Sequence, residues 1–160
     1  ERNFEPGEPF VLGRSRVLRE GSDVALVAYG VTGNEALSAA QTLAADGVEC
    51  EVISARFAKP IDREMVRRVL SNFDMVVTVE DHALAGGFGA VMLETAAELR
   101  LDASRVVRLG LPDDWIEVAS RREQMARVGI DAAGISATVR EELVEGGEAA
   151  RPHRRIGHAI

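Results

Sequence analysis

The sequence has a single cysteine, Cys50, among its 160 residues, so no disulfide can form within the chain. This cysteine usage fits a reducing compartment, and no apolar leader follows Glu1, so the sequence predicts a cytoplasmic protein. Its apolar runs are far too short to cross a membrane, and we expect no membrane partner. The formal net charge of −7 argues against a nucleic-acid partner, which would require a basic face.

Signatures of catalysis are also missing. There is no Gly-x-Ser-x-Gly motif, no Ser/His/Asp set and no cluster of cysteines and histidines with the spacing of metal ligands. From the sequence we therefore expect no catalytic, cofactor-binding or metal-binding residues on this chain. What is present is an apolar content of 46% in a chain of single-domain length, which is enough for a folded core.

Short apolar runs alternate with stretches that carry apolar residues at helical spacing. The expected strands are residues 24–29, 50–54, 75–79 and 106–109, with an extra edge strand within 10–19. The expected helices follow Thr32, Asp62 and Ser120 or span residues 89–99 and 132–143. This alternation predicts an α/β fold with three layers, α/β/α, around a mostly parallel five-stranded sheet with one antiparallel edge strand.

Local spacings predict how three of the helices begin. Thr32 with Glu35 and Ser120 with Glu123 have the spacing of capping boxes. Asp62 directly precedes an apolar helical stripe and is expected to accept hydrogen bonds from the first turn of that helix.

The segments that look least like generic core lie where the predicted strands end, at residues 29–33, 54–59, 80–89 and 110–115. The carboxyl ends of parallel strands share one edge of a sheet, and ligands of such sheets usually bind there. We therefore expect any specialised role to lie at this edge.

Several residues at this edge admit two interpretations. Gly86, Gly87 and Gly89 could cradle an anion, but close packing against a neighbouring chain is the favoured interpretation. A general acid/base role for Glu80 and Asp81 is disfavoured, because adjacent residues on an extended chain point in opposite directions.

Other candidates are single residues of a rare type. His82 is a poor metal candidate, since no second histidine or cysteine is near in sequence, and a surface or interface hydrogen bond is favoured. Trp115, the only tryptophan, is interpreted as an exposed interface anchor, with packing of its loop on the core as the alternative. Cys50 has no basic neighbour in its strand and is interpreted as a structural thiol.

Together these observations predict an association surface, to which Phe88 and Trp115 would contribute exposed apolar area. The interface candidates are Glu80, Asp81, His82, Gly86, Gly87, Phe88 and Trp115. Arg56 and Lys59 are candidate contacts for an anion, although pairing with carboxylates at a strand end is the favoured role.

Four motifs carry a family resemblance that covers about residues 10–143. They are Gly13-Arg-Ser-Arg-Val-Leu-Arg-Glu-Gly-Ser-Asp23, Arg56-Phe-Ala-Lys-Pro-Ile-Asp62, Val79-Glu-Asp-His-Ala-Leu-Ala-Gly-Gly-Phe-Gly89 and Gly110-Leu-Pro-Asp-Asp-Trp-Ile-Glu117. The chain resembles the C-terminal domain of the transketolase-like thiamine diphosphate enzymes, and within them it is most similar to the 1-deoxy-D-xylulose-5-phosphate synthases. It departs from the family at Glu80-Asp81, where Glu-Glu is common, and at Val118-Ala119, where His-Gly is frequent.

The resemblance implies one domain of a larger transferase of isoprenoid precursor synthesis. The parent enzyme would use thiamine diphosphate and magnesium, and this domain would contact the preceding thiamine-binding domains and support a homodimer. The family's diphosphate signature, Gly-Asp-Gly followed by paired asparagines, is absent here, so we expect this chain alone to bind no cofactor and to be inactive. Alternatives are the C-terminal domain of a transketolase or of a 2-oxo acid dehydrogenase beta subunit, or a free-standing non-catalytic interaction module.

The expected organisation has three parts. Residues 1–9 would form a linker from a preceding domain, residues 10–144 the transketolase C-terminal-like domain, and residues 145–160 a mobile tail.

Overall fold

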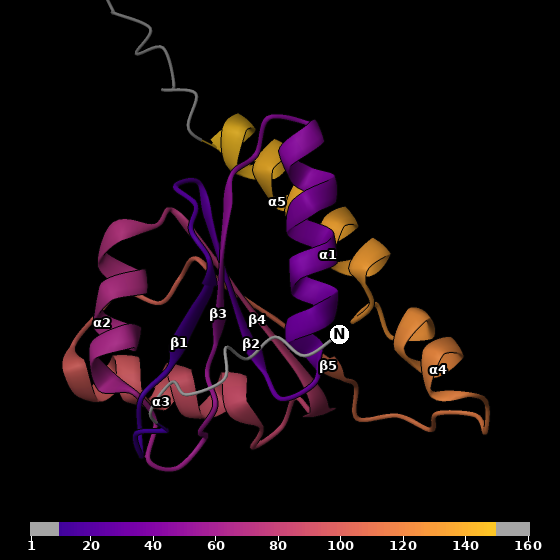
Figure 1. Cartoon of the computed structure of the whole chain (residues 1–160), viewed down its shortest axis with the longest axis horizontal. Helices are drawn as coiled ribbons and strands as arrows, with labels where there is room; N and C mark the ends of the chain where they lie inside the picture. Colours follow the sequence, from indigo (N-terminus) through magenta and orange to yellow (C-terminus); the bar gives the residue numbers. More distant parts are fainter. Residues whose placement is uncertain (1–9, 150–160) are drawn as a thin grey trace, which may run out of the picture.

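The computed structural model describes residues 10–149, and Figure 1 shows how their helices and strands are arranged. Within these residues there are five strands and five helices. In chain order they are β1 (Arg16–Arg19), β2 (Val24–Tyr29), α1 (Thr32–Ala45), β3 (Cys50–Ser54), α2 (Arg63–Asn72), β4 (Met75–Ala83), α3 (Phe88–Leu99), β5 (Val106–Leu111), α4 (Arg121–Arg127) and α5 (Ala132–Ala149).

The five strands form one sheet in the order β1-β3-β2-β4-β5. β2 pairs in parallel with both β3 and β4, and β4 pairs in parallel with β5. β1 is antiparallel to β3 and lies at the edge of the sheet. The predicted mostly parallel sheet with one antiparallel edge strand is therefore confirmed.

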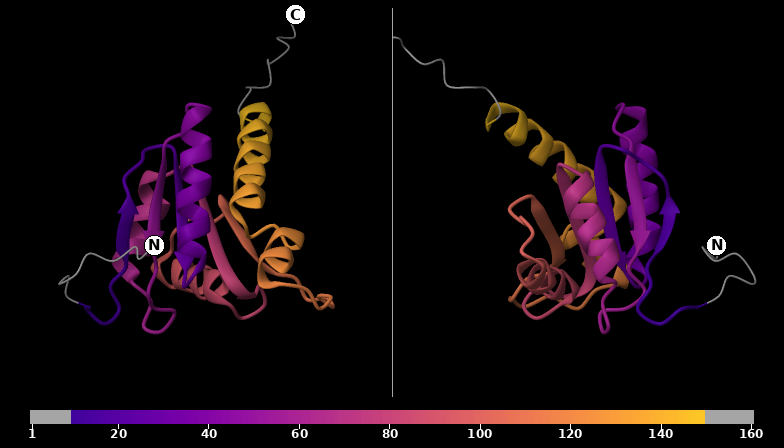
Figure 2. Two further views of the ribbon diagram at one scale, coloured as in Figure 1. Left: turned by 45° about the vertical axis from the view of Figure 1, so that its right-hand side comes forward. Right: turned by 90° about the vertical axis from the view of Figure 1, so that its left-hand side faces the viewer.

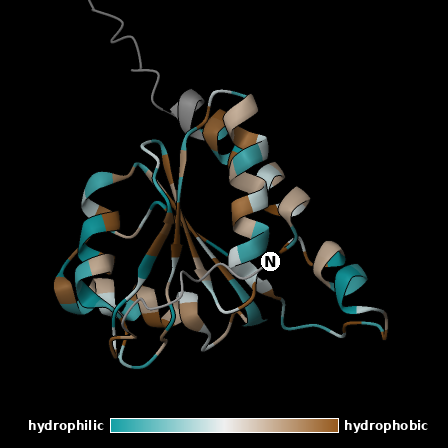
Figure 3. Cartoon of the chain, in the orientation of Figure 1, coloured by the Kyte–Doolittle hydropathy of each residue, from teal (hydrophilic) through white to brown (hydrophobic). Residues whose placement is uncertain are grey.

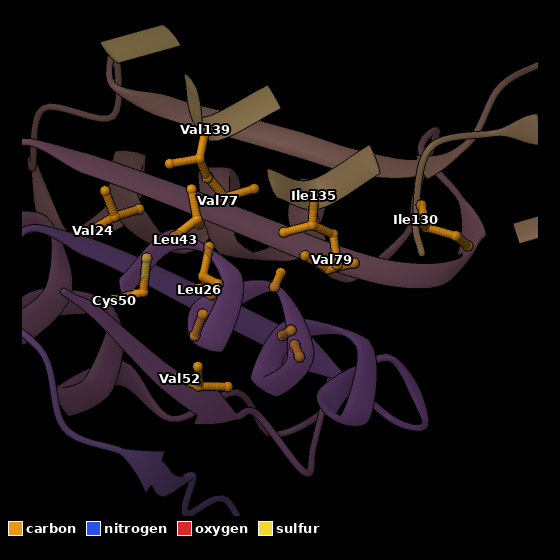
Figure 4. Close-up of a cluster of buried hydrophobic side chains, with 14 of the residues drawn as sticks. Val24, Leu26, Leu43, Cys50, Val52, Val77, Val79, Ile130, Ile135 and Val139 are labelled. Carbon is orange, nitrogen blue, oxygen red and sulfur yellow. The ribbon is translucent and has the colours of Figure 1, made fainter. Parts of the chain in front are cut away.

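Helices cover both faces of the sheet (Figure 2), and each face has its own apolar core. On one face, α1 and α5 pack on the sheet through residues such as Leu43 and Val139, which are fully buried with Leu26 and Val77 (Figure 4). On the other face, α2 and α3 bury Val66 and other residues against β2, β3 and β4. Figure 3 shows the resulting pattern, with hydrophobic strands inside and hydrophilic stretches on the outer sides of the helices.

The chain changes direction at the centre of the sheet. From β2 it passes through α1 to β3 on one side, and from β3 it passes through α2 to β4 on the other side of β2. β2 and β4 are neighbours, yet α1 and α3, which follow them, cover opposite faces. The carboxyl ends of β2 and β4 therefore form a topological switch point, the place where open α/β sheets leave a crevice for ligands.

Two of the predicted helix caps are confirmed. The Asp62 carboxylate accepts hydrogen bonds from the N–H groups of Glu64 and Met65 at the start of α2. Ser120 and Glu123 form a complete capping box at the start of α4.

The capping box predicted at Thr32 and Glu35 is wrong. The residue before α1 is Val31, and no side chain caps this helix. The Thr32 hydroxyl instead donates to the carbonyl of Val79 at 2.9 Å, and the Glu35 carboxylate accepts from the N–H of Ala132, the first residue of α5, at 3.0 Å. Glu35 therefore caps a different helix, and the two helix starts are tied together.

Three elements are longer than predicted: β4 extends to Ala83, β5 to Leu111 and α5 to Ala149. The linker expected at 1–9 lies outside the described residues, as do residues 150–160 of the mobile tail expected at 145–160. Residues 145–149 of that expected tail are helical instead and form the end of α5. None of the helices among residues 10–149 is long and apolar enough to span a membrane.

Candidate functional site

A cavity of about 380 Å³ opens at the switch point. Residues from the ends of β2, β3 and β4 and from the start of α3 line it: Tyr29, Arg56, Phe57, Ala58, Lys59, Glu80, His82, Gly86, Gly87, Phe88 and Val91. The structure thus brings both candidate anion contacts together with five of the seven interface candidates. This cavity lies at the edge of the sheet where the sequence predicted a specialised role.

The only carboxylate that lines the cavity, Glu80, is turned into the protein. Its side chain is fully buried, and its two oxygens accept hydrogen bonds from the N–H of Phe88 at 2.5 Å and from the N–H of Gly89 at 2.9 Å. These are the first two residues of α3, whose N-terminal N–H groups would otherwise lack partners. Glu80 therefore caps α3 and faces the positive end of its dipole.

Close approaches of the chain around this cap explain Gly87 and Gly89. A Cβ atom on Gly87 would lie 2.2 Å from Glu80 Oε2, and one on Gly89 would lie 2.7 Å from the Thr78 hydroxyl. Neither position has room for a side chain. The glycines allow the chain to approach its own carboxylate, so an anion cradled on the first amides of α3, the interpretation disfavoured from sequence, would compete with Glu80.

The loop after β3 forms the opposite wall of the cavity. Arg56 has a left-handed backbone with φ +58°, an uncommon conformation for a residue with a side chain, and strained residues of this kind often lie at functional sites. Its guanidinium lies 5.3 Å from the centre of the Phe10 ring, and Phe10 in turn lies 5.0 Å from Phe57. The segment that enters the domain therefore contacts the loop that carries Arg56 and Lys59.

Asp62 anchors the end of this loop. Besides capping α2, its carboxylate accepts hydrogen bonds from the N–H of Ser15 at 2.8 Å and from the Ser15 hydroxyl at 2.9 Å. Burial alone would raise the pKa of Asp62, but the hydrogen bonds from Ser15 and Met65 and the nearby Arg14 guanidinium outweigh it, and the pKa lies below its usual value. A carboxylate held in its charged form fixes one end of the cavity wall.

Aromatic side chains form the floor. Tyr29 and Phe88 stack with their ring centres 5.4 Å apart and their planes 7° from parallel. Phe88 is only 2% exposed, so the prediction that it supplies exposed apolar area at an interface is wrong. Glu80, likewise predicted at the interface, is buried in its own domain for the reason given above.

Trp115 is not among the residues that line the cavity. It belongs to the loop between β5 and α4, which extends away from the sheet (Figure 1). It is 84% exposed and Val118 is 95% exposed, which excludes packing of Trp115 on the core of this chain. Arg121 at the end of the loop forms an ion pair with Asp81 at 2.7 Å, which ties the loop to β4. The interface candidates thus fall into three groups. Glu80 and Phe88 are buried, and His82, Gly86 and Gly87 line the cavity. Trp115 lies in the exposed loop, to which Asp81 is joined through Arg121.

Cys50 shows no sign of a reactive thiol. It is fully buried in β3, and burial raises its pKa to about 11. At neutral pH the nucleophilic thiolate is therefore scarce.

The residues present do not fit the magnesium complex of thiamine diphosphate that the family resemblance implies. Among residues 10–149 no group of three or more histidine, cysteine, aspartate or glutamate side chains could hold a metal ion. The one carboxylate at the cavity is occupied by the amides of α3. No catalytic step through this cofactor follows from these residues.

Comparisons with known proteins agree with the motifs. Residues 13–135 match the family model described as "Transketolase, C-terminal domain". The chain is 43% identical over 136 residues to 1-deoxy-D-xylulose-5-phosphate synthase 1 of Geobacter sulfurreducens, which covers 85% of this chain and 21% of the relative. It is 47% identical over 132 residues to the 1-deoxy-D-xylulose-5-phosphate synthase of Thermomicrobium roseum, covering 81% of this chain and 21% of the relative.

A similar solved structure is titled "Split gene transketolase, inactive beta4 tetramer". It superimposes with a TM-score of 0.80 at 32% sequence identity, over 90% of this chain and 46% of that one. The chain thus spans about a fifth of the length of these synthases and shares their C-terminal domain. By its matched residues, its sheet order and its motifs, it belongs to the transketolase C-terminal domain family.

Proposed function

We propose that this chain acts as the C-terminal domain of a 1-deoxy-D-xylulose-5-phosphate synthase. The whole enzyme would condense pyruvate with glyceraldehyde 3-phosphate in the cytoplasm, with thiamine diphosphate and magnesium bound by its preceding domains. The observation that carries the proposal is the identity of 36% to 47% to synthases of this name across 81% to 96% of the chain.

In this proposal the domain positions other parts of the enzyme and performs no chemistry itself. The exposed loop around Trp115 and Val118 would contact the preceding domains or a second copy of the enzyme. Two large apolar side chains that are 84% and 95% exposed support this role, since such exposed pairs often mark interaction sites. The Arg121–Asp81 ion pair would hold the loop at the carboxyl edge of the sheet.

A second candidate is the C-terminal domain of a transketolase. The likeness to the split-gene transketolase, at 32% identity, favours it, although the identity to the synthases is higher. That protein's title describes an inactive assembly of four beta chains, which is compatible with a domain that associates without catalysing.

A domain graft tests the proposal. Residues 10–149 would replace the matching region of the Geobacter sulfurreducens synthase, and condensation of pyruvate with glyceraldehyde 3-phosphate would be measured. We expect the graft to restore activity to a version of that synthase that lacks the region. A folded graft that stays inactive would contradict the synthase assignment, and activity restored only in a transketolase grafted in the same way would favour the second candidate.

The same graft tests the association loop. A graft with Trp115→Ala should lose activity or dimer content, while a graft with Val144→Ala, which truncates an exposed apolar residue on α5, should keep both. Equal behaviour of the two grafts would contradict the proposed role of the loop.

A further inference from the structure

We propose that the cavity at the switch point between β2 and β4 is a binding site for a small organic oxyanion, a phosphate ester or a carboxylate on a compact apolar or aromatic body. Three independent observations point to such a ligand: the charge of the rim, the apolar floor and the place of the cavity in the sheet.

The rim is cationic in a chain whose formal net charge is −7. Two cationic side chains, Arg56 and Lys59, line the cavity beside His82. Lys59 is the only lysine among the 19 basic residues, it is exposed, and it forms no ion pair with any residue between 10 and 149. Its ammonium group therefore remains available to an oxyanion.

The basic residues on the neighbouring helix behave differently. Arg63 pairs with Glu98 at 2.5 Å, and Arg68 forms two hydrogen bonds with Glu51, at 2.9 and 2.6 Å. Local pairing with carboxylates was the favoured sequence interpretation for Arg56 and Lys59, and for Lys59 the described residues provide no such partner. The sole lining carboxylate, Glu80, has both oxygens engaged by α3.

The floor suits the body of an organic molecule. Tyr29, whose ring stacks on the buried Phe88, lines the cavity together with Phe57, Ala58 and Val91. A volume of about 380 Å³ lies in the range of sites that bind small molecules, which are mostly apolar with a few placed polar groups. Inorganic phosphate would leave this apolar surface unused, so an organic anion fits better than a free ion.

The position of the cavity follows from the order of the strands. Tyr29 and Glu80 are paired across β2 and β4 at their carboxyl ends, and the chain leaves these strands toward opposite faces. Ligands of open α/β sheets bind in the crevice that this divergence creates. The site requires no synthase activity of the whole protein. Evidence against the function proposed above would therefore not disprove the site, and evidence against the site would not disprove that function.

Binding can be measured by NMR on the whole 160-residue chain labelled with ¹⁵N. The probes are phenyl phosphate and benzoate. Phenol is the neutral aromatic control, and inorganic phosphate is the anion that carries no organic group. We expect saturable shifts at the amides of Lys59, His82 and Gly86 with phenyl phosphate or benzoate, and weaker binding of phenol and of inorganic phosphate. The anion that binds more tightly identifies the headgroup.

A pair of charge-matched variants tests the rim. Lys59→Gln should raise the dissociation constant about three- to tenfold, the effect expected of one charge-assisted hydrogen bond. Arg67→Gln removes the same charge from an exposed position on α2 that does not line the cavity, and it should leave the dissociation constant unchanged. Equal effects of the two variants would show that only net charge matters and would overturn the site.

Two other results would also overturn it. One is the absence of saturable shifts up to millimolar probe, the upper range of ordinary metabolite affinities. The other is an acidic peptide without aromatic residues that binds as tightly as phenyl phosphate, since that would make the rim a contact for a protein segment.

Discussion

The carboxylate of Glu80 accepts a hydrogen bond of 2.5 Å from the main-chain N–H of Phe88, eight residues later in the chain. A side chain within strand β4 thereby replaces the usual cap, which comes from the residue just before a helix. The same carboxylate fixes the backbone that the cavity needs, because Gly87 and Phe88 both line it.

Glu80→Gln should lower the free energy of unfolding by about 1–3 kcal/mol. The amide keeps the shape but offers one acceptor oxygen to two N–H groups, and its NH₂ group would face a donor. Urea unfolding measures the effect, and Glu94→Gln, at an exposed position of α3, is the control that should change little. If both variants unfold at the same urea concentration, Glu80 does not stabilise the helix as described.

Gly87→Ala should cost about 1–3 kcal/mol of stability for a steric reason alone. Gly87 has φ −79°, which alanine adopts freely, but its new Cβ would lie 2.2 Å from Glu80 Oε2 and 2.3 Å from the carbonyl oxygen of Ala83. Gly33→Ala in α1 is the matched control, since there the nearest heavy atom of the surroundings is Leu18 Cδ1 at 3.6 Å.

The control should be close to neutral, since Gly33 is the second residue of α1 and an added Cβ would make only ordinary van der Waals contact there. Thermal melts of the two variants decide the point. A Gly87→Ala protein as stable as Gly33→Ala would mean that the glycine is not required for the close approach of Glu80.

Sequence reasoning succeeded where the determining contacts are local. The apolar run at 24–29 marked β2, and the position of Asp62 directly before an apolar helical stripe marked a helix cap, because both depend on neighbours within a few residues. It failed for Glu35, whose partner Ala132 is 97 residues away. A capping-box spacing states only that two residues could meet, and the packing of α1 beside α5 decided otherwise.

Phe88 shows a second limit. Its position after two glycines in a loop motif indicated exposure, but the ring turns into the core and stacks on Tyr29, which comes from a strand far earlier in the chain. The acidic Glu80 within β4 and the glycines at the start of α3 together carried a signal for the Glu80 cap, and the sequence interpretation assigned both to an interface instead.

Asp62→Asn should destabilise the protein by about 0.5–2 kcal/mol at neutral pH, as the loss of a helix cap usually does. The folded pKa of Asp62 lies below the ordinary value of 3.8, so the charged form stabilises the fold fully above that value. The contribution is lost as the pH falls below 3.8 through the lower folded pKa. Urea unfolding of both proteins from neutral to acid pH should therefore show a difference that shrinks on acidification, and a constant difference would contradict it.

Cys50 should react with a thiol reagent only when the protein unfolds. The side chain is fully buried and its pKa is raised to about 11, so the folded state offers neither access nor thiolate. Labelling with iodoacetamide at increasing urea should follow the unfolding curve measured by circular dichroism. Rapid labelling in buffer would show that the strand opens locally.

Trp115→Ala should weaken self-association, or docking onto the preceding domains, by about 1–3 kcal/mol, the range of an aromatic anchor. The side chain is 84% exposed, so truncation removes almost no contact within the chain and the melting temperature should stay nearly unchanged. Sedimentation equilibrium and thermal melts separate the two quantities, with Val144→Ala as an exposed apolar control on α5 that should alter neither. A large fall in melting temperature with unaltered association would mean that Trp115 stabilises the fold of its own domain. That result would contradict the proposal that the loop is an interface.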